Sequence, residues 1–242
     1  MGPQEGSVGR VAGSDGLAYI PAINADLHQD TQSVAEAESW MRPAVPHTIV
    51  NVGYRSTNFW VISAGPVRLM VDLGWPGMFG ALEANLRRMG IGVREIGYGL
   101  ATHYHIDHAG AAQDLKNHGM QLIVTDEQGP FIVQMKQHIK PSDHYTEIAL
   151  HDNRRVSCAE SRSFLASLGI PGEIVATPGH SDDSVSLLLD TGEAFTGDLT
   201  LPMMATEESA AQVAGSWSLL RTRGARQMYG GHGPVRPIPV EG

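Results

Sequence analysis

The chain has 242 residues, 42% of them hydrophobic and 18% charged, a composition that predicts a soluble globular protein. Its formal net charge of −9 offers no overall field to attract phosphate backbones, so we expect no nucleic-acid partner. The one cysteine, Cys158, excludes an intrachain disulfide, and we interpret it as an inert thiol. No apolar run reaches spanning length and the Gly-rich start lacks a signal-peptide pattern, so we expect a cytoplasmic protein without a membrane partner.

Periodicity changes near residue 46. Residues 1–45 are weakly periodic, and we expect a loosely structured N-terminal arm with one short helix around 32–41, followed by a single domain over 46–242. In chain order, short β-rich runs predict strands at 48–53, 58–63, 67–73, 98–102, 120–125, 173–177, 184–190, 193–196 and 226–229. Apolar stripes predict helices at 78–89, 108–117, 161–168 and 206–223. Alternating strands and helices predict sheets covered by helices.

Two segments have no regular pattern. Residues 136–152 are polar and rich in histidine, with Pro141 as a breaker, and we expect a loop that can act as a lid over a site. Residues 234–242 contain three prolines and are expected to lie on the surface.

The strongest functional signal is the hexapeptide His-Tyr-His-Ile-Asp-His, residues 103–108, directly after the predicted strand 98–102. In an extended segment His103 and His105 project to the same side, and Asp107 and His108 come at the start of the next helix. Imidazole and carboxylate groups suit zinc and similar borderline metals. A His-rich surface loop is the alternative, and signals later in the chain argue against it.

Three further residues each follow a predicted strand of the second half. His180 lies in a Pro-Gly turn, Asp198 comes directly after Gly197, and His232 stands among glycines. Each alone is an ordinary turn residue. With the hexapeptide they supply five histidines and two aspartates, enough for two metal ions that share one carboxylate.

The order and setting of these residues resemble the metallo-β-lactamase superfamily of metallo-hydrolases over roughly residues 48–236. The resemblance implies an α/β fold, an αββα sandwich of two mixed β-sheets flanked by helices, with the site at one edge. It also implies that Asp72, in a turn similar to the family's Asp-Thr-Gly turn, supports the ligand loop. An ordinary turn aspartate is the alternative for that residue.

The resemblance further implies the metal ligands. The first metal would be held by His103, His105 and His180, the second by Asp107, His108 and His232, and Asp198 would bridge the two.

The expected function is therefore that of a metal-dependent hydrolase. We expect it to cleave an ester, thioester or lactone of a small molecule through a hydroxide that bridges two divalent ions, zinc first, with manganese or iron as alternatives. Such ions lower the pKa of bound water to roughly 7 and stabilise an oxyanion. Asp107 is the expected catalytic group, which orients the hydroxide and passes a proton to the leaving group.

Other functions stay open. A mononuclear-iron oxygenase acting on persulfides would use the first-site ligands, whereas a degenerate binding module has no support because all seven ligands are present. An N-acyl homoserine lactonase is a narrower alternative, although its family often has a tyrosine where this chain has Leu201; Tyr104 or Tyr229 could supply that hydroxyl, or simply pack. Trp75 and Met203 are candidates for an apolar pocket wall. The oligomeric state stays open, a dimer included.

Overall fold

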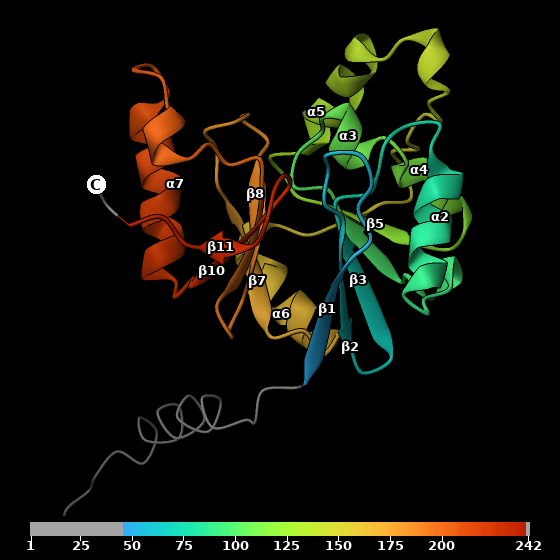
Figure 1. Ribbon diagram of the computed structural model, residues 1–242, viewed down its shortest axis with the longest axis horizontal. Coiled ribbons are helices and arrows are strands. Elements are labelled where there is room, and N and C mark those ends of the chain that lie inside the picture. The colour runs from blue at the N-terminus through green and yellow to red at the C-terminus, as the bar shows by residue number, and fades with distance from the viewer. Residues whose placement is uncertain (1–45, 241–242) are drawn as a thin grey trace, which may run out of the picture. The chain divides into compact units, whose positions relative to one another are not determined.

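A computed structural model describes residues 46–240 of the chain; the predicted arm and its helix at 32–41 lie outside the described residues. Within residues 46–240 the strands form two sheets, as Figure 1 shows. The first sheet consists, in spatial order, of β1 (His47–Asn51), β2 (Trp60–Ala64), β3 (Val67–Val71), β4 (Tyr98–Leu100), β5 (Gln121–Val124) and β6 (Arg154–Arg155). The second consists of β11 (Arg236–Pro237), β10 (Gln227–Gly230), β9 (Glu193–Gly197), β8 (Val185–Leu189) and β7 (Gly172–Ala176).

Both sheets are mixed, as expected. In the first, β1, β2 and β3 are antiparallel neighbours, while β3, β4, β5 and β6 run parallel. In the second, β8 is antiparallel to β7 and β9, β9 and β10 are parallel, and β11 closes the edge antiparallel to β10. Strands β7, β9 and β10 therefore share one direction, so their carboxyl ends meet at one edge of the second sheet.

The helices lie against both sheets, which Figure 1 shows with α2 and α4 on the side of the first sheet and α7 on the side of the second. Their bounds are α2 (Phe79–Arg88), α3 (Ile106–Ala109), α4 (Ala112–Asn117), α5 (Gly129–Met135), α6 (Cys158–Ser167) and α7 (Ala210–Thr222). Short 3-10 helices are η1 (Val93–Glu95), η2 (Lys136–His138), η3 (Pro141–Asp143) and η4 (Pro202–Met204). None of the described helices is both long and apolar enough to cross a membrane.

Alternating strand residues divide the core into three apolar layers. Ile62, Leu69 and Leu187 belong to the layer between the two sheets, where Leu165 of α6 joins them.

Their neighbours in sequence point the other way, because side chains alternate along a strand. Val61 and Met70 pack outward with Leu82 and Leu86 of α2 and Leu115 of α4. Leu188 packs outward with Val213, Trp217 and Leu220, which form the buried face of α7. The αββα sandwich is thereby confirmed.

The predicted helix 108–117 is in fact two short helices, α3 and α4. Backbone contacts with the turn after β3 divide them: Leu73 N–H donates to the His108 carbonyl and Ala111 N–H to that of Gly74. Gly110, between the helices, leaves no room for a side chain, because a Cβ there would overlap Pro76. Tertiary contacts thus override a local helical pattern and fix the segment that carries Asp107 and His108.

Smaller differences have similar causes. Strand β2 begins at Trp60 rather than at Asn58, because the Asn58 amide donates to the Gly231 carbonyl of the second sheet. Helix α5 and strand β6 were not predicted. The expected loop 136–152 contains η2 and η3, and the expected surface tail forms β11 and buries Ile238.

Cys158 is half-buried, and burial with the nearby Glu127 carboxylate raises the pKa of its thiol to about 11, which favours the inert thiol.

Candidate metal centre

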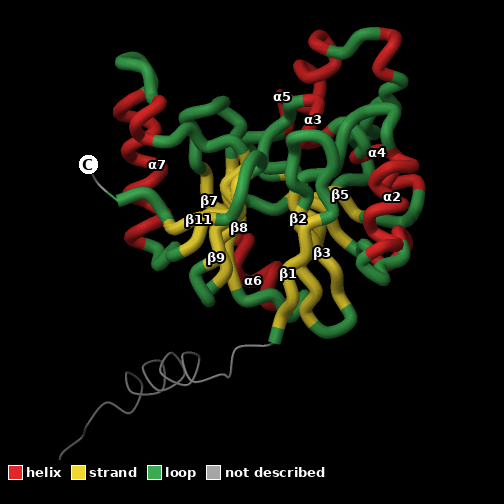
Figure 2. The backbone as a smooth tube through the Cα atoms, in the orientation of Figure 1, coloured by secondary structure: helices red, strands yellow, loops and turns green. Residues whose placement is uncertain are grey.

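All seven predicted ligands lie at the carboxyl ends of strands on facing edges of the two sheets. The segment 103–108 follows β4, whereas His180, Asp198 and His232 follow β7, β9 and β10. The parallel direction of β7, β9 and β10 brings those three to one edge. Figure 2 shows the loops at the upper end of both sheets gathered above the strands. Residues far apart in the chain thus meet in one cluster, as the sequence predicted.

Three imidazoles form the first group. His105 Nδ1 lies 3.0 Å from His103 Nε2 and 3.1 Å from His180 Nε2. Two nitrogens that bind one tetrahedral zinc ion, each about 2.0–2.1 Å from it, are about 3.3 Å apart. The ligand atoms of His103, His105 and His180 all lie within 4.8 Å of one another, so one cation can contact all three.

A carboxylate and two imidazoles form the second group, Asp107, His108 and His232. Asp107 Oδ2 lies 3.4 Å from His108 Nε2 and 3.4 Å from His232 Nε2. These separations match the spacing that one shared cation requires, and they are too long for hydrogen bonds of good geometry. The structure therefore offers a second position for a cation beside the first.

Asp198 lies between the two groups. Its Oδ2 is 3.4 Å from His108 Nε2, 3.3 Å from His232 Nε2 and 3.8 Å from His180 Nε2. One oxygen thereby approaches members of both groups. This position is the one that a bridging carboxylate requires.

Asp72 fixes the orientation of the buried ligand loop. Its Oδ2 lies 2.9 Å from His108 Nδ1, and its Oδ1 accepts from the backbone N–H and the hydroxyl of Thr102, both at 2.8 Å. A proton on His108 Nδ1 that donates to Asp72 leaves Nε2 with its lone pair toward the cluster. Asp72 adopts a left-handed backbone conformation, with φ 62°, which lets it reach across from the end of β3. It does what the resemblance implied.

The electrostatics of the cluster favour a cation. Burial lowers the pKa of His108, but the Asp72, Asp107 and Asp198 carboxylates outweigh it and raise that pKa well above the ordinary value. Burial raises the pKa of Asp107, but the neighbouring His108 and the Thr57 hydroxyl lower it to about 2 overall. Burial and the adjacent imidazoles lower the pKa of His103 well below its usual range. His103 is thus a neutral imidazole, the state in which histidine binds metals, whereas the three carboxylates around His108 favour a positive charge at that position, which a bound cation would supply.

Two buried atoms and two glycines support the fit of a metal. His108 Nε2 and Asp198 Oδ1 are buried without a hydrogen-bond partner among the described residues, which is costly unless another group satisfies them. At Gly231 a Cβ would come within 2.5 Å of Asp198 Oδ1 and 2.6 Å of His108 Cε1, so only glycine leaves that space free. At Gly197 the φ of 52° and the nearby Thr102 side chain likewise exclude larger residues. The residues present therefore fit metal ions.

Sequence reasoning missed two polar residues that hold the ligands. Asp183, which is 2% exposed, accepts a 2.7 Å hydrogen bond from the Tyr104 N–H and so ties the loop after β7 to the hexapeptide. Thr57, also 2% exposed, donates to Asp107. No periodicity or motif marks Thr57, and the one local signal that could have pointed to Asp183 is the pair of aspartates shortly after His180.

The other candidates divide between core and surface. Tyr104 is buried in the outer layer of the first sheet, and Tyr229 packs on Trp60 with ring centroids 5.0 Å apart, so both pack rather than present a hydroxyl. Trp75 is half-buried and bonded to Thr57, whereas Met203 is 90% exposed. The segment 136–152 rests on the rim near Trp75, because Asp143 and His144 pack on Gly77.

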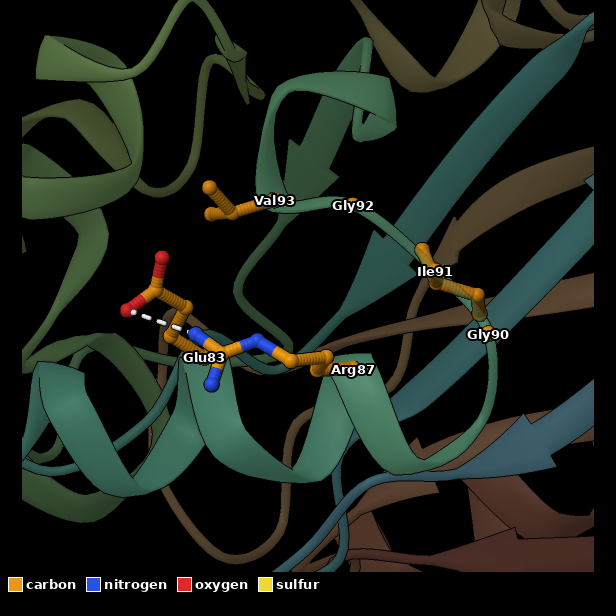
Figure 3. Close-up of a pocket in the computed structure, with 6 residues that line it drawn as sticks. All are labelled: Glu83, Arg87, Gly90, Ile91, Gly92 and Val93. Carbon is orange, nitrogen blue, oxygen red and sulfur yellow. Dashed lines mark ion pairs between the residues drawn. The ribbon is translucent and has the colours of Figure 1, made fainter.

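A separate surface hollow of about 320 Å³ lies beside the carboxyl end of α2. Figure 3 shows its lining, Glu83, Arg87, Gly90, Ile91, Gly92 and Val93, with an ion pair between Glu83 and Arg87. It contains none of the seven ligands, so the chemistry of the chain is not placed there.

Comparison with known proteins shows the family to which the chain is similar. A profile of the metallo-beta-lactamase superfamily matches residues 52–227. A beta-lactamase-like protein 2 homologue from Caenorhabditis elegans is 27% identical over 77% of this chain and 59% of its own length. A probable metallo-hydrolase from Methanocaldococcus jannaschii is 30% identical over 60% of this chain and 68% of its own length. An atrochrysone carboxyl ACP thioesterase from Aspergillus fumigatus is 29% identical over 75% of this chain, which spans 52% of that protein.

Solved structures share the fold. A metallo-beta-lactamase family protein from Thermus thermophilus superposes with a TM-score of 0.61 at 19% identity, covering 82% of this chain and 76% of that one. A subclass B3 metallo-beta-lactamase of Bradyrhizobium japonicum superposes with a TM-score of 0.57 at 19% identity, covering 78% and 76%. At such identities the likeness concerns the fold.

Proposed function

From the premise that the chain belongs to the metallo-beta-lactamase superfamily, we propose that it is a hydrolase that uses two divalent metal ions to cleave an ester, thioester or lactone of a small molecule. One observation carries the proposal: the ligand atoms of seven side chains from both sheets converge in two adjacent groups with Asp198 between them.

The proposed assignment follows the two groups. One ion would be held by His103, His105 and His180, and the other by Asp107, His108 and His232. Asp198 approaches members of both groups through Oδ2 and would be shared by the two ions. Zinc is the first candidate, because imidazole and carboxylate ligands in compact sites suit it, and manganese and iron are the alternatives.

When bound, the ions make a water nucleophilic at neutral pH and polarise the carbonyl of the substrate. Asp107 lies at the edge of the cluster and stays ionised, with its pKa near 2, so it accepts a hydrogen bond from the attacking water and orients it. The buried His103 and His108 and the carboxylate of Asp72 keep this arrangement rigid.

Thioesters are the first substrate class to test. One relative is named as an ACP thioesterase, and Met203 and Met204, which follow Asp198 on η4, are 90% and 68% exposed. Exposed apolar side chains that follow a proposed ligand so closely in the chain are candidates to contact the acyl chain of a substrate. Esters and lactones form the comparison classes, because the same attack on an acyl carbon cleaves all three.

The test is a hydrolysis screen over these three bond types with three preparations: protein loaded with zinc, chelator-treated protein, and chelator-treated protein with zinc restored. We expect turnover of at least one class that disappears on chelation and returns with zinc, with two zinc ions per chain by metal analysis. One iron per chain together with oxygen consumption on a persulfide would instead establish the oxygenase. Tight zinc binding without turnover of any class would leave a binding module.

A further inference from the structure

The loop between β1 and β2, residues 52–59, touches the site from outside the ligand segments. Thr57 in this loop is 2% exposed, and its hydroxyl donates a 3.1 Å hydrogen bond to Asp107 Oδ2. We propose that Thr57 is a positioning residue, which holds Asp107 in the orientation that the second metal ion requires. The inference rests on the proposed function, because it assigns a role toward one of the two ions.

The direction of the hydrogen bonds at Thr57 is settled by its neighbours. An ionised carboxylate only accepts, so the Thr57 hydroxyl must donate to Asp107. The indole N–H of Trp75 only donates, and it lies 3.2 Å from Thr57 Oγ1. The result is a chain of hydrogen bonds from Trp75 through Thr57 to Asp107, in which the hydroxyl accepts once and donates once. Trp75 therefore keeps the Thr57 proton pointed at the carboxylate.

The oxygen that accepts from Thr57 is the one that faces the cluster. Asp107 Oδ2 also lies 3.4 Å from the Nε2 atoms of His108 and His232. A carboxylate oxygen has two lone pairs, so it can accept from Thr57 and contact a cation at once. The terminal torsion of an aspartate side chain has a broad energy minimum and does not hold the oxygens by itself. A fixed donor at Oδ2 supplies the missing restraint.

The same loop fixes His232, the exposed member of the second group. His232 Nδ1 lies 2.6 Å from the Ser56 carbonyl, so a proton on Nδ1 donates there and Nε2 faces the cluster. Thr57 and His232 also form an antiparallel backbone bridge. Next to them, Asn58 N–H donates to the Gly231 carbonyl at 2.7 Å, and its side-chain amide donates to the Gly233 carbonyl at 2.8 Å.

These contacts concern one of the two metal groups. Ser56 and Thr57 contact His232 and Asp107, both in the second group, whereas His103 lies against Thr102 and His105. Loss of the Thr57 hydroxyl should therefore loosen one metal ion and leave the other. A general defect in folding would affect both, which makes the two effects separable.

The experiment is a titration of chelator-treated protein with zinc, in which calorimetry measures the binding of each ion. Thr57→Val removes the hydroxyl at nearly constant size, Thr57→Ser keeps it, and Thr48→Val, at an exposed position of β1, is the matched control. We expect Thr57→Val to weaken binding of one zinc ion by about 10–100-fold, the range for residues that orient metal ligands, while the other ion binds as in the wild type. Thr57→Ser and Thr48→Val should bind both zinc ions with wild-type affinity. The affinity of Trp75→Phe for the weakened zinc ion should lie between those of Thr57→Ser and Thr57→Val.

Thermal unfolding of the metal-free variants checks the fold, and we expect melting temperatures close to that of the wild type. If Thr57→Val binds two zinc ions with wild-type affinities, the role of the hydroxyl is refuted. It is also refuted if Thr57→Ser loses as much zinc affinity as Thr57→Val. If both ions weaken equally in Thr57→Val, the assignment to the second group is refuted. A wild-type protein that binds fewer than two zinc ions refutes the proposed function itself, an outcome distinct from the others.

Discussion

The two halves of the candidate metal centre are held in place by different means. In the half that follows β4, His103 and His108 are 1% and 0% exposed, and the buried carboxylate of Asp72 fixes their loop. In the half on the second sheet, the side chains of His180 and His232 are 29% and 40% exposed. Glycine backbone and the β1–β2 loop hold them instead. The first half is held mainly by buried groups of its own sheet, with Asp183 of the second sheet as an added tie, whereas the second half depends on how the two sheets meet.

The largest effect is expected at Asp107, where the two halves meet. Asp107→Asn keeps the size of the side chain but removes the charge that orients water. We expect kcat for the substrate found in the screen to fall by about 10²–10⁴-fold, the range for a group that assists proton transfer. Asp126→Asn, at an exposed carboxylate, is the control and should leave kcat unchanged. Unchanged turnover in Asp107→Asn would remove this residue from the mechanism.

Removal of the metal tests whether the two sheets are joined through it. When the free zinc concentration is 100 times the dissociation constant, binding adds about 2.7 kcal/mol per site to the free energy of unfolding. We therefore expect chelation to lower the melting temperature and added zinc to restore it, as measured by circular dichroism. Equal melting temperatures with and without zinc would show that metal binding does not stabilise the fold.

Asp72 tests the rigidity of the buried half. Asn also tolerates the left-handed backbone found at this position, so Asp72→Asn changes the charge and the hydrogen bond to His108 with little strain. We expect zinc affinity or activity to fall by about 10–100-fold, because such partners orient metal ligands. Zinc titration measures the effect, and wild-type affinity would reduce Asp72 to a turn residue.

The smallest expected effect is on the stability of the metal-free protein, in which the two halves of the centre should differ. In the metal-free protein, His103→Ala should reduce the free energy of unfolding by about 1–3 kcal/mol, because a buried side chain bonded to Thr102 is lost. His180→Ala should change it by no more than about 0.5 kcal/mol, as is usual at exposed positions. Urea unfolding of both variants compares them. Equal losses would show that the second half is as firmly built as the first.

Much of this centre was predictable because its signals are local. Histidine and aspartate directly after β-rich runs mark strand ends, and small residues beside them, such as Gly197 and Gly231, mark close approach. The strand pattern predicted sheets covered by helices, and the resemblance implied two mixed sheets, which the structure confirms. What failed was the helix 108–117, which looked continuous because the contacts of Leu73 and Ala111 that divide it come from a distant turn.

The sequence by itself determined which side chains can bind metal and which strands they follow, since residue type and periodicity are properties of neighbouring positions. Only the tertiary structure decided which groups orient those ligands. Thr57 stands 50 residues from Asp107, and Asp183 stands 79 residues from Tyr104. No periodicity joins such pairs, because their hydrogen bonds exist only in the folded chain: Thr57 and Asp107 meet at one end of the first sheet, and Asp183 meets Tyr104 only when the two sheets pack together.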